Sequence, residues 1–115
     1  LQSTSSARWS PGEPAINVYR AGGAFRPHED EQALTILVPL TDSADFSGGG
    51  TAFWPGQSGR RDETDSQPSH VLIPPAGTAL LFGGTVTHAA QPTMAGERCI
   101  FVGSFSPQGS HWEQR

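Results

Sequence analysis

Short apolar segments separated by glycine, proline and polar residues run along most of the chain. The clearest is LTILVPL at 34–40, whose length and apolar character are typical of a strand covered on both faces. No segment shows a convincing helical periodicity. Together the segments predict an all-β protein with about seven or eight strands and little helix. The predicted strands lie at 15–20, 34–40, 50–55, 70–75, 77–84, 85–90 and 97–106.

Many short strands with turn signals between them are typical of an antiparallel sandwich or jelly roll. The length of 115 residues fits a single domain. We expect this domain at 15–106, after a polar N-terminal segment at 1–14 and before a C-terminal tail at 107–115. The stretch 56–69, GQSGRRDETDSQPS, is polar and lacks periodicity, which predicts an exposed, mobile loop.

The composition narrows the classes of site and partner. Cys99 is the only cysteine, so an intrachain disulfide and a cysteine-based zinc site are excluded. Its apolar surroundings, CIFVGSF, predict a buried and inert thiol. The formal net charge of −4 argues against non-specific nucleic-acid binding, which rests on a basic surface.

Neither the apolar segments nor the start of the chain fixes a compartment. No apolar stretch approaches the ~20 residues that a membrane helix needs, so we expect no membrane partner. The chain begins at Leu1 rather than at methionine, and we expect a processed form or an excised domain. The localisation is therefore left open.

Polar groups gather just before the strand at 34–40, in the sequence FRPHEDEQ. On a strand, residues i and i+2 point to the same face, so His28 and Asp30 would project together. A solvated, hydrogen-bonded pair is the alternative. His88 lies between two apolar strands and is the best-placed third ligand, because His70 borders the polar loop and His111 lies in the tail. Two histidines and one carboxylate form the facial triad of non-haem Fe(II) oxygenases, although Mn or Zn also fits this ligand set.

Arg98 follows ten residues after His88, at the start of the last apolar strand. An arginine that points into an apolar interior is costly unless an anion meets it, and a carboxylate can do so with two hydrogen bonds. The alternative is a surface salt bridge. Together, the three candidate ligands and Arg98 predict a pocket that holds a metal and, next to it, a carboxylate-bearing cosubstrate.

The order of these motifs resembles the Fe(II)/2-oxoglutarate oxygenases of the prolyl/lysyl hydroxylase class. The motifs are the His-x-Asp of His28 and Asp30, the segments SGGGTAF and PPAGTALLF, the distal His88, and the GER that ends at Arg98. They run from about Tyr19 to Ser106. The spacing in PHEDEQALTILVPL and THAAQPTMAGERCIFVGSFSP is most similar to the procollagen lysyl hydroxylase catalytic domain.

The resemblance implies a double-stranded β-helix, a cupin-like jelly roll, with His28, Asp30 and His88 as iron ligands. It implies that Arg98 binds the distal carboxylate of 2-oxoglutarate. Two further cosubstrate residues are expected, Tyr19 and Thr35, with plain core packing as the alternative for each. The implied cofactors are Fe(II), 2-oxoglutarate as cosubstrate and O₂, with ascorbate as a further candidate.

The implied activity is hydroxylation of a C–H bond with release of succinate and CO₂. The leading substrate is a peptidyl lysine or proline, and the alternatives are free amino acids, other small molecules and nucleobases. Leu37 and Pro39 depart from the family pattern. They affect the prediction of the substrate and leave the predicted reaction unchanged. Helices usually precede the first strand in this family and are missing here, so we expect a minimal core or a fragment.

Two rival classes compete with an enzyme. The first is a non-catalytic, cupin-like metal-binding β-sandwich module, which needs no 2-oxoglutarate. The second is a structural or interaction domain in which the histidines and the aspartate are incidental.

Overall fold

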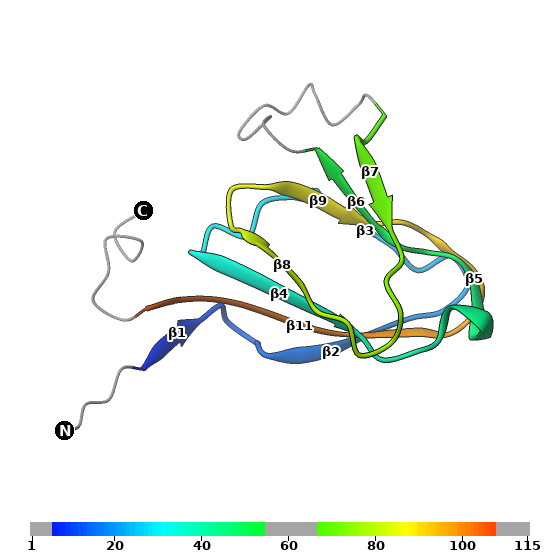
Figure 1. Ribbon diagram of the computed structural model, residues 1–115, viewed down its shortest axis with the longest axis horizontal. Coiled ribbons are helices and arrows are strands. Elements are labelled where there is room, and N and C mark those ends of the chain that lie inside the picture. Colours follow the sequence, from blue (N-terminus) through cyan, green and yellow to red (C-terminus); the bar gives the residue numbers. More distant parts are fainter. Residues whose placement is uncertain (1–5, 55–66, 108–115) are drawn as a thin grey trace.

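The computed structural model of the chain describes residues 6–54 and 67–107. These residues form strands joined by short turns (Figure 1). The only helix among them is the short 3-10 turn η1 (Ser43–Asp45), and none is long and apolar enough to cross a membrane. The predicted all-β class is thus confirmed. The strands are β1 (Ala7–Trp9), β2 (Ala15–Tyr19), β3 (Phe25–His28), β4 (Leu34–Pro39), β5 (Phe46–Gly48), β6 (Thr51–Trp54), β7 (His70–Leu72), β8 (Leu80–Gly83), β9 (Thr87–Ala90), β10 (Thr93–Gly96) and β11 (Arg98–Pro107).

Each predicted strand is present, as β2, β4, β6, β7, β8, β9 and β11. Four further strands, β1, β3, β5 and β10, were not predicted. Each is three or four residues long and contains an arginine, a proline or a glycine, so no apolar run marks it. These strands exist because a partner strand offers free backbone hydrogen bonds.

The larger sheet has the strand order β1-β11-β4-β8, with β2 also paired to β11. Strand β11 is 10 residues long and pairs antiparallel with β4 along one side. Along its other side, the first half pairs with β2 and the last three residues pair with β1. Strands β1 and β2 therefore follow one another along β11. The predicted domain start at residue 15 is the first residue of β2, so β1 lies before it.

The smaller sheet has the order β3-β9-β6-β7, and β5 and β10 form a separate two-stranded pair. All strand pairings among the described residues are antiparallel. The β5 end of the fold lies at the right of Figure 1, away from the N-terminal strand β1. Two antiparallel sheets with non-consecutive strand neighbours are the architecture of a jelly roll.

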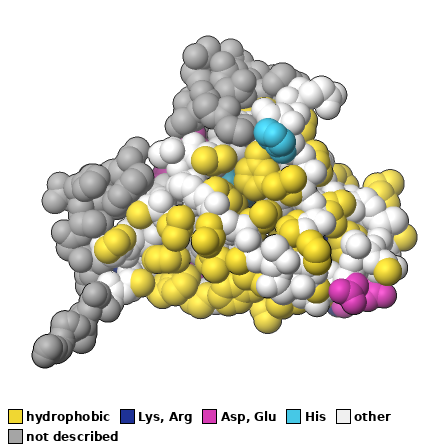
Figure 2. All heavy atoms as spheres, in the orientation of Figure 1, with side chains coloured by type: hydrophobic (Ala, Val, Ile, Leu, Met, Phe, Trp, Pro, Cys, Tyr) yellow, Lys and Arg dark blue, Asp and Glu magenta, His cyan; other side chains and the backbone are white. Residues whose placement is uncertain are grey.

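The alternation of side chains along the strands gives the larger sheet two different faces. In β2, Asn17 and Tyr19 turn toward the interior, whereas the side chains of Ile16 and Val18 are 59% and 45% exposed. Leu81 of β8 is 61% exposed. The outward face of this sheet is therefore rich in apolar groups, and Figure 2 shows apolar side chains over much of the visible surface.

Polar residues make up more of the described interior than apolar ones. The buried apolar residues are Leu37, Pro39, Ala52, Phe53, Trp54, Ala89 and Ile100. The buried polar or charged residues are Thr35, Thr51, Thr87, His88, Thr93, Arg98, Ser104 and Ser106. Such an interior is costly unless its polar groups are paired or face a ligand.

The prediction of a buried thiol at Cys99 is wrong, because this side chain is only half-buried. Its neighbours Arg98 and Ile100 point inward at 3% exposure each. Strand alternation then turns Cys99 toward the outer face.

Candidate functional site

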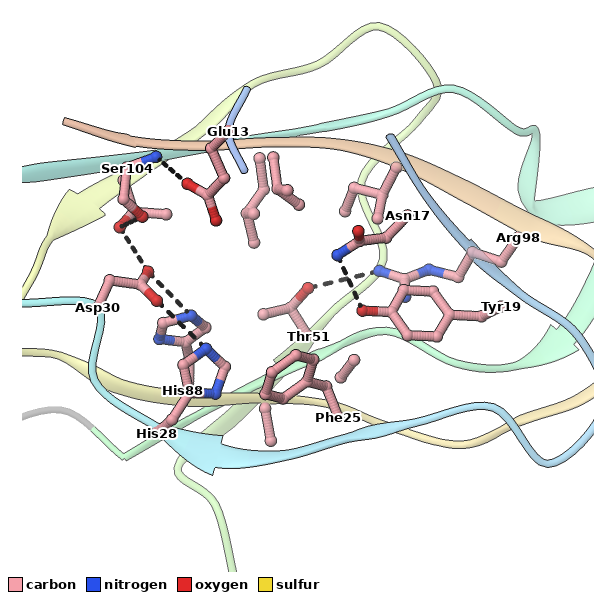
Figure 3. A pocket seen from close by; sticks show the side chains of 16 residues that line it. Glu13, Asn17, Tyr19, Phe25, His28, Asp30, Thr51, His88, Arg98 and Ser104 are labelled. Atoms are coloured by element: carbon pink, nitrogen blue, oxygen red, sulfur yellow. Dashed lines mark hydrogen bonds and ion pairs between the residues drawn. The ribbon is translucent and has the colours of Figure 1, made fainter. Parts of the chain in front are cut away.

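A cavity of about 180 Å³ lies between the two sheets, and residues of both sheets line it (Figure 3). Cavities of about 150 Å³ admit a benzene-sized ligand, so there is room here for a small organic molecule. Every site residue predicted from the sequence lines this cavity. These residues are Tyr19, His28, Asp30, Thr35, His88 and Arg98.

The three predicted metal ligands come together at one end of the cavity. His28 ends β3 and stands directly opposite His88 of β9 in the strand register. Asp30 Oδ1 lies 3.2 Å from His28 Nε2, and Asp30 Oδ2 lies 3.3 Å from His88 Nε2. One ligand atom from each residue lies within 4.8 Å of the others. Ligands held at about 2.1 Å from one ion, at right angles, are about 3 Å apart, so this spacing fits a metal ion.

The backbone fixes which nitrogen of each imidazole faces the centre of the group. The Nδ1 atom of His28 lies 2.8 Å from the carbonyl oxygen of Arg26, and that of His88 lies 3.0 Å from the carbonyl oxygen of Val86. Because a carbonyl only accepts, each Nδ1 carries a hydrogen and donates it. The Nε2 lone pairs are then left for a cation, as in metal-binding histidines generally.

Asp30 reaches this position from a loop, not from a strand as the i, i+2 argument assumed. Strand β3 ends at His28, and the following backbone turns sharply at Glu31, which has a φ of 66°. The N–H groups of Asp30 and Glu31 both donate to the carbonyl oxygen of Gly84, each at 3.0 Å. Gly84 is needed there because a Cβ on it would lie 1.7 Å from the carbonyl oxygen of Gln32.

A chain of hydroxyl groups ends on the Asp30 carboxylate. The hydroxyl of Thr35 donates to Asp30 Oδ2 at 2.6 Å, and Ser104 Oγ lies 3.1 Å from Thr35 Oγ1. Since the one hydrogen of Thr35 goes to Asp30, Ser104 must be the donor in the second bond. Thr35 and Ser104 are 2% and 3% exposed. Thr35 thus contacts the carboxylate of a candidate metal ligand, and its predicted contact with a cosubstrate stays a prediction.

The electrostatics of the three ligands favour a positive charge between them. Burial alone would raise the pKa of Asp30, but hydrogen bonds from His28, His88 and Thr35 outweigh it and hold this pKa well below its usual range. Burial alone would lower the pKa of His28, but hydrogen bonds to Asp30 and to the Arg26 carbonyl raise it above its ordinary value. In the absence of a metal, a proton on the imidazole serves the same electrostatic need.

Arg98 approaches the cavity from the start of β11 (Figure 3). Its Nη1 atom is buried without a hydrogen-bond partner among the described residues, and its Nη2 donates to Thr51 Oγ1 only at 3.5 Å. The guanidinium carbon lies 5.6 Å from the ring centroid of Tyr19. Burial lowers the pKa of Arg98, and Tyr19 opposes that shift.

Glycine makes room for this arginine. Gly49 has a φ of 73°, and a Cβ on it would lie 3.0 Å from Cδ of Arg98. The neighbouring Gly48 and Gly50 also have positive φ values, which residues with a side chain rarely adopt.

Sequence reasoning missed further cavity residues. They are Glu13, Asn17, Phe25, Thr51 and Ser104. Asn17 could have been found, because it shares a face with Tyr19 two residues later, and its amide donates to the Tyr19 hydroxyl at 3.5 Å. Glu13 gave no such signal, since it lies in the segment predicted to precede the domain.

Among the described residues, His70 is the remaining histidine, and it does not join the group. His70 opens β7 and is exposed. His111 lies outside the described residues, as does most of the loop predicted at 56–69.

Comparisons with known proteins identify a family and one structural neighbour. The model of the 2OG-Fe(II) oxygenase superfamily matches residues 14–106. No curated protein matches the chain. Among the solved structures that match is the crystal structure of an RmlC-like cupin protein from Desulfovibrio desulfuricans, with 11% identity and a TM-score of 0.45. That match covers 87% of this chain and 81% of the cupin chain.

Proposed function

The chain belongs to the 2OG-Fe(II) oxygenase superfamily, and we propose that it is an Fe(II)- and 2-oxoglutarate-dependent dioxygenase that hydroxylates a C–H bond of a peptidyl lysine or proline. His28, Asp30 and His88 hold the iron in this proposal, and Arg98 binds the distal carboxylate of 2-oxoglutarate. Tyr19 borders the same carboxylate. Ascorbate is kept as a proposed accessory reductant.

The observation that carries the proposal is the burial of the Arg98 guanidinium without a full set of hydrogen-bond partners. Its side chain is 3% exposed, has an unpartnered Nη1 and lines the same cavity as the three metal-ligand candidates. A guanidinium in this situation calls for an anion, and a carboxylate satisfies two of its N–H groups at once. A dicarboxylic acid that binds the metal with one end and Arg98 with the other meets both requirements.

The donor set also fits the metal. Imidazole and carboxylate ligands suit Fe(II), and three protein ligands leave coordination positions open for a cosubstrate and for O₂. When bound, iron and 2-oxoglutarate supply the oxidising chemistry, in which O₂ converts the cosubstrate to succinate and CO₂ and hydroxylates the substrate.

The protein's own groups position and isolate these reactants. The carbonyl oxygens of Arg26 and Val86 orient the two imidazoles, and the hydroxyl of Thr35 holds the Asp30 carboxylate. Apolar side chains, among them Leu37, Ile100 and Val102, line the wall of the cavity. Such walls exclude water and strengthen the charge interactions inside.

The test is an anaerobic titration of the purified protein with Fe(II) and then 2-oxoglutarate, followed by visible absorption. We expect the weak metal-to-ligand charge-transfer band that forms when the cosubstrate chelates Fe(II). Asp30→Asn should abolish the band, whereas Asp45→Asn, a control on the exposed η1 turn, should leave it unchanged.

Succinate release in air then measures turnover of the cosubstrate. If metal binds but neither the band nor succinate forms, the non-catalytic metal-binding module replaces this proposal. If no metal binds, the residues are incidental and the interaction-domain alternative stands.

A further inference from the structure

Glu13 is a charged group in the cavity to which the proposed chemistry assigns no role. It lies in the segment between β1 and β2, just before the range matched by the family model. Its neighbours Gly12 and Pro14 are exposed, while Glu13 itself is half-buried and lines the cavity. Figure 3 shows its side chain entering the cavity on the same side as Ser104.

One oxygen of the carboxylate is firmly anchored. Oε1 accepts a hydrogen bond from the backbone N–H of Ser104 at 2.6 Å. The backbone of the segment is held at the same place, because the N–H of Ser10 donates to the carbonyl oxygen of Ser104 at 2.9 Å. The N–H of Glu13 in turn donates to the Ser10 carbonyl oxygen at 3.1 Å. A carboxylate fixed in this way is preorganised for a ligand.

The anchoring bond alone does not explain the charge. Strand β11 changes partner from β2 to β1 near Ser104, so the Ser104 N–H needs an acceptor there. An amide oxygen would satisfy this N–H equally well and would avoid placing a negative charge in a partly buried site. If the role of Glu13 were purely structural, a glutamine at this position would be sufficient.

The positive groups of the described cavity wall have neighbours other than Glu13. His28 and His88 face Asp30, and Arg98 has the Tyr19 ring and Thr51 as its neighbours. No ion pair of Glu13 occurs among the described residues. The charge of Glu13 is thus left for a group that the protein itself does not supply.

We propose that Glu13 selects a substrate with a cationic nitrogen group, an amine or a guanidinium, by binding it with the second carboxylate oxygen. This inference rests on the proposed function and favours a lysyl side chain over a prolyl one. A proline ring in a peptide carries no charge for Glu13 to bind. The carboxylate holds the cationic end of the side chain while its C–H bonds face the metal end of the cavity.

The test uses Glu13→Gln, which keeps the acceptor for Ser104 and removes only the charge. The matched control is Glu97→Gln, which removes an exposed carboxylate paired with Arg20 at 3.0 Å. The substrates are peptides of one sequence with lysine, arginine, Nε-acetyl-lysine or proline at the central position. Mass spectrometry detects the added oxygen atom, and succinate release without peptide reports cosubstrate turnover separately.

We expect oxygen on the lysyl or arginyl peptide and none on the acetyl-lysyl or prolyl peptide. Glu13→Gln should lower kcat/KM for the cationic peptide on the order of 10- to 100-fold, the value of a charge-assisted hydrogen bond. Metal affinity should be retained, and Tm should be equal or higher, because the amide keeps the bond to Ser104 and avoids the partly buried charge. Preferential oxidation of the prolyl or acetyl-lysyl peptide would overturn the inference, and so would an unchanged kcat/KM.

A binding measurement separates this inference from the proposed function. Nα-acetyl-lysine amide and its Nε-acetylated analogue are titrated into both proteins and followed by NMR. If the unmodified protein prefers the free amine and Glu13→Gln does not, the role of Glu13 holds even for a protein that releases no succinate. Equal binding of the two probes would refute the role of Glu13 and leave the oxygenase proposal untouched.

Discussion

Replacing Arg98 by methionine should make the ligand-free protein more stable while removing its response to 2-oxoglutarate. Methionine keeps an apolar stem in the buried position and removes the cation. The unmade hydrogen bonds of the buried guanidinium cost roughly 1–3 kcal/mol in the ligand-free state. Against this gain stands the loss of the contact with the Tyr19 ring, which at 5.6 Å is near the limit for a cation–π interaction. That contact contributes about 0.5 kcal/mol.

The expected net effect is a gain of about 0.5–2.5 kcal/mol in the free energy of unfolding. For a domain of this size, each 1 kcal/mol raises Tm by about 4 °C. The assay is urea and thermal unfolding followed by circular dichroism, with and without Mn(II) and 2-oxoglutarate. At a concentration of 100 Kd, the cosubstrate should stabilise the unmodified protein by about 2.7 kcal/mol and Arg98→Met hardly at all. Mn(II) alone should stabilise both proteins equally, since Arg98 does not contact the metal ligands.

The control is Arg20→Met, which removes an exposed arginine paired with Glu97. Its effect should stay within about 0.5 kcal/mol. The reasoning is refuted if Arg98→Met loses stability and still responds to 2-oxoglutarate. Arg98 would then be a structural cation, with its charge compensated inside the ligand-free cavity.

Three further perturbations test the metal end of the cavity. Thr35→Val removes the hydrogen bond to Asp30 and should weaken Mn(II) binding, measured by calorimetry, about 10- to 100-fold. Thr35→Ser keeps the hydroxyl and should bind Mn(II) nearly as well as the unmodified protein. Equal losses of affinity in the two variants would show that Thr35 acts through packing alone. The raised pKa of His28 means that its protonation favours the folded, metal-free state. This contribution is fully present below its ordinary pKa of about 6.5 and is lost as the pH rises through the raised value. Metal affinity should rise over the same range, and a pH-independent affinity would contradict this. Gly84→Ala forces a Cβ against the Gln32 backbone and should destabilise the fold by about 1–3 kcal/mol in urea titrations. At the adjacent Gly83 a Cβ meets nothing within 4 Å, so Gly83→Ala should be nearly neutral.

The fold could be predicted from the sequence wherever a run of apolar residues marks a strand. LTILVPL became β4, as its length and apolar character predicted. Only alternate residues, Thr35, Leu37 and Pro39, are fully buried, and those between them are half-buried, so the strand is less covered than expected. Strand β1 could not be found, because Ala-Arg-Trp has no periodicity and pairs with residues near the far end of the chain. Its existence depends on the length of β11, a tertiary property.

The candidate site divides in the same way. The sequence was enough to find His28, Asp30, His88 and Arg98. Their residue types are common in metal and anion sites, and the residues lie next to predicted strands. These side chains are positioned by contacts between residues far apart in the chain, and such contacts cannot be read from a single sequence. The bond between Glu13 and Ser104 spans 91 positions.

The polar interior explains why a chain with only 35% hydrophobic residues can still form this fold. The buried hydroxyls of Ser104 and Thr35 form a chain of hydrogen bonds that ends on Asp30. Besides Glu13, two sets of groups remain unmatched in the described cavity: the guanidinium of Arg98, and the lone pairs that converge from His28, Asp30 and His88. They have opposite electrostatic requirements, an anion for the first and a cation for the second. In the proposed function, a metal bound to a dicarboxylate meets both requirements. Binding of the metal and the dicarboxylate therefore also stabilises the fold.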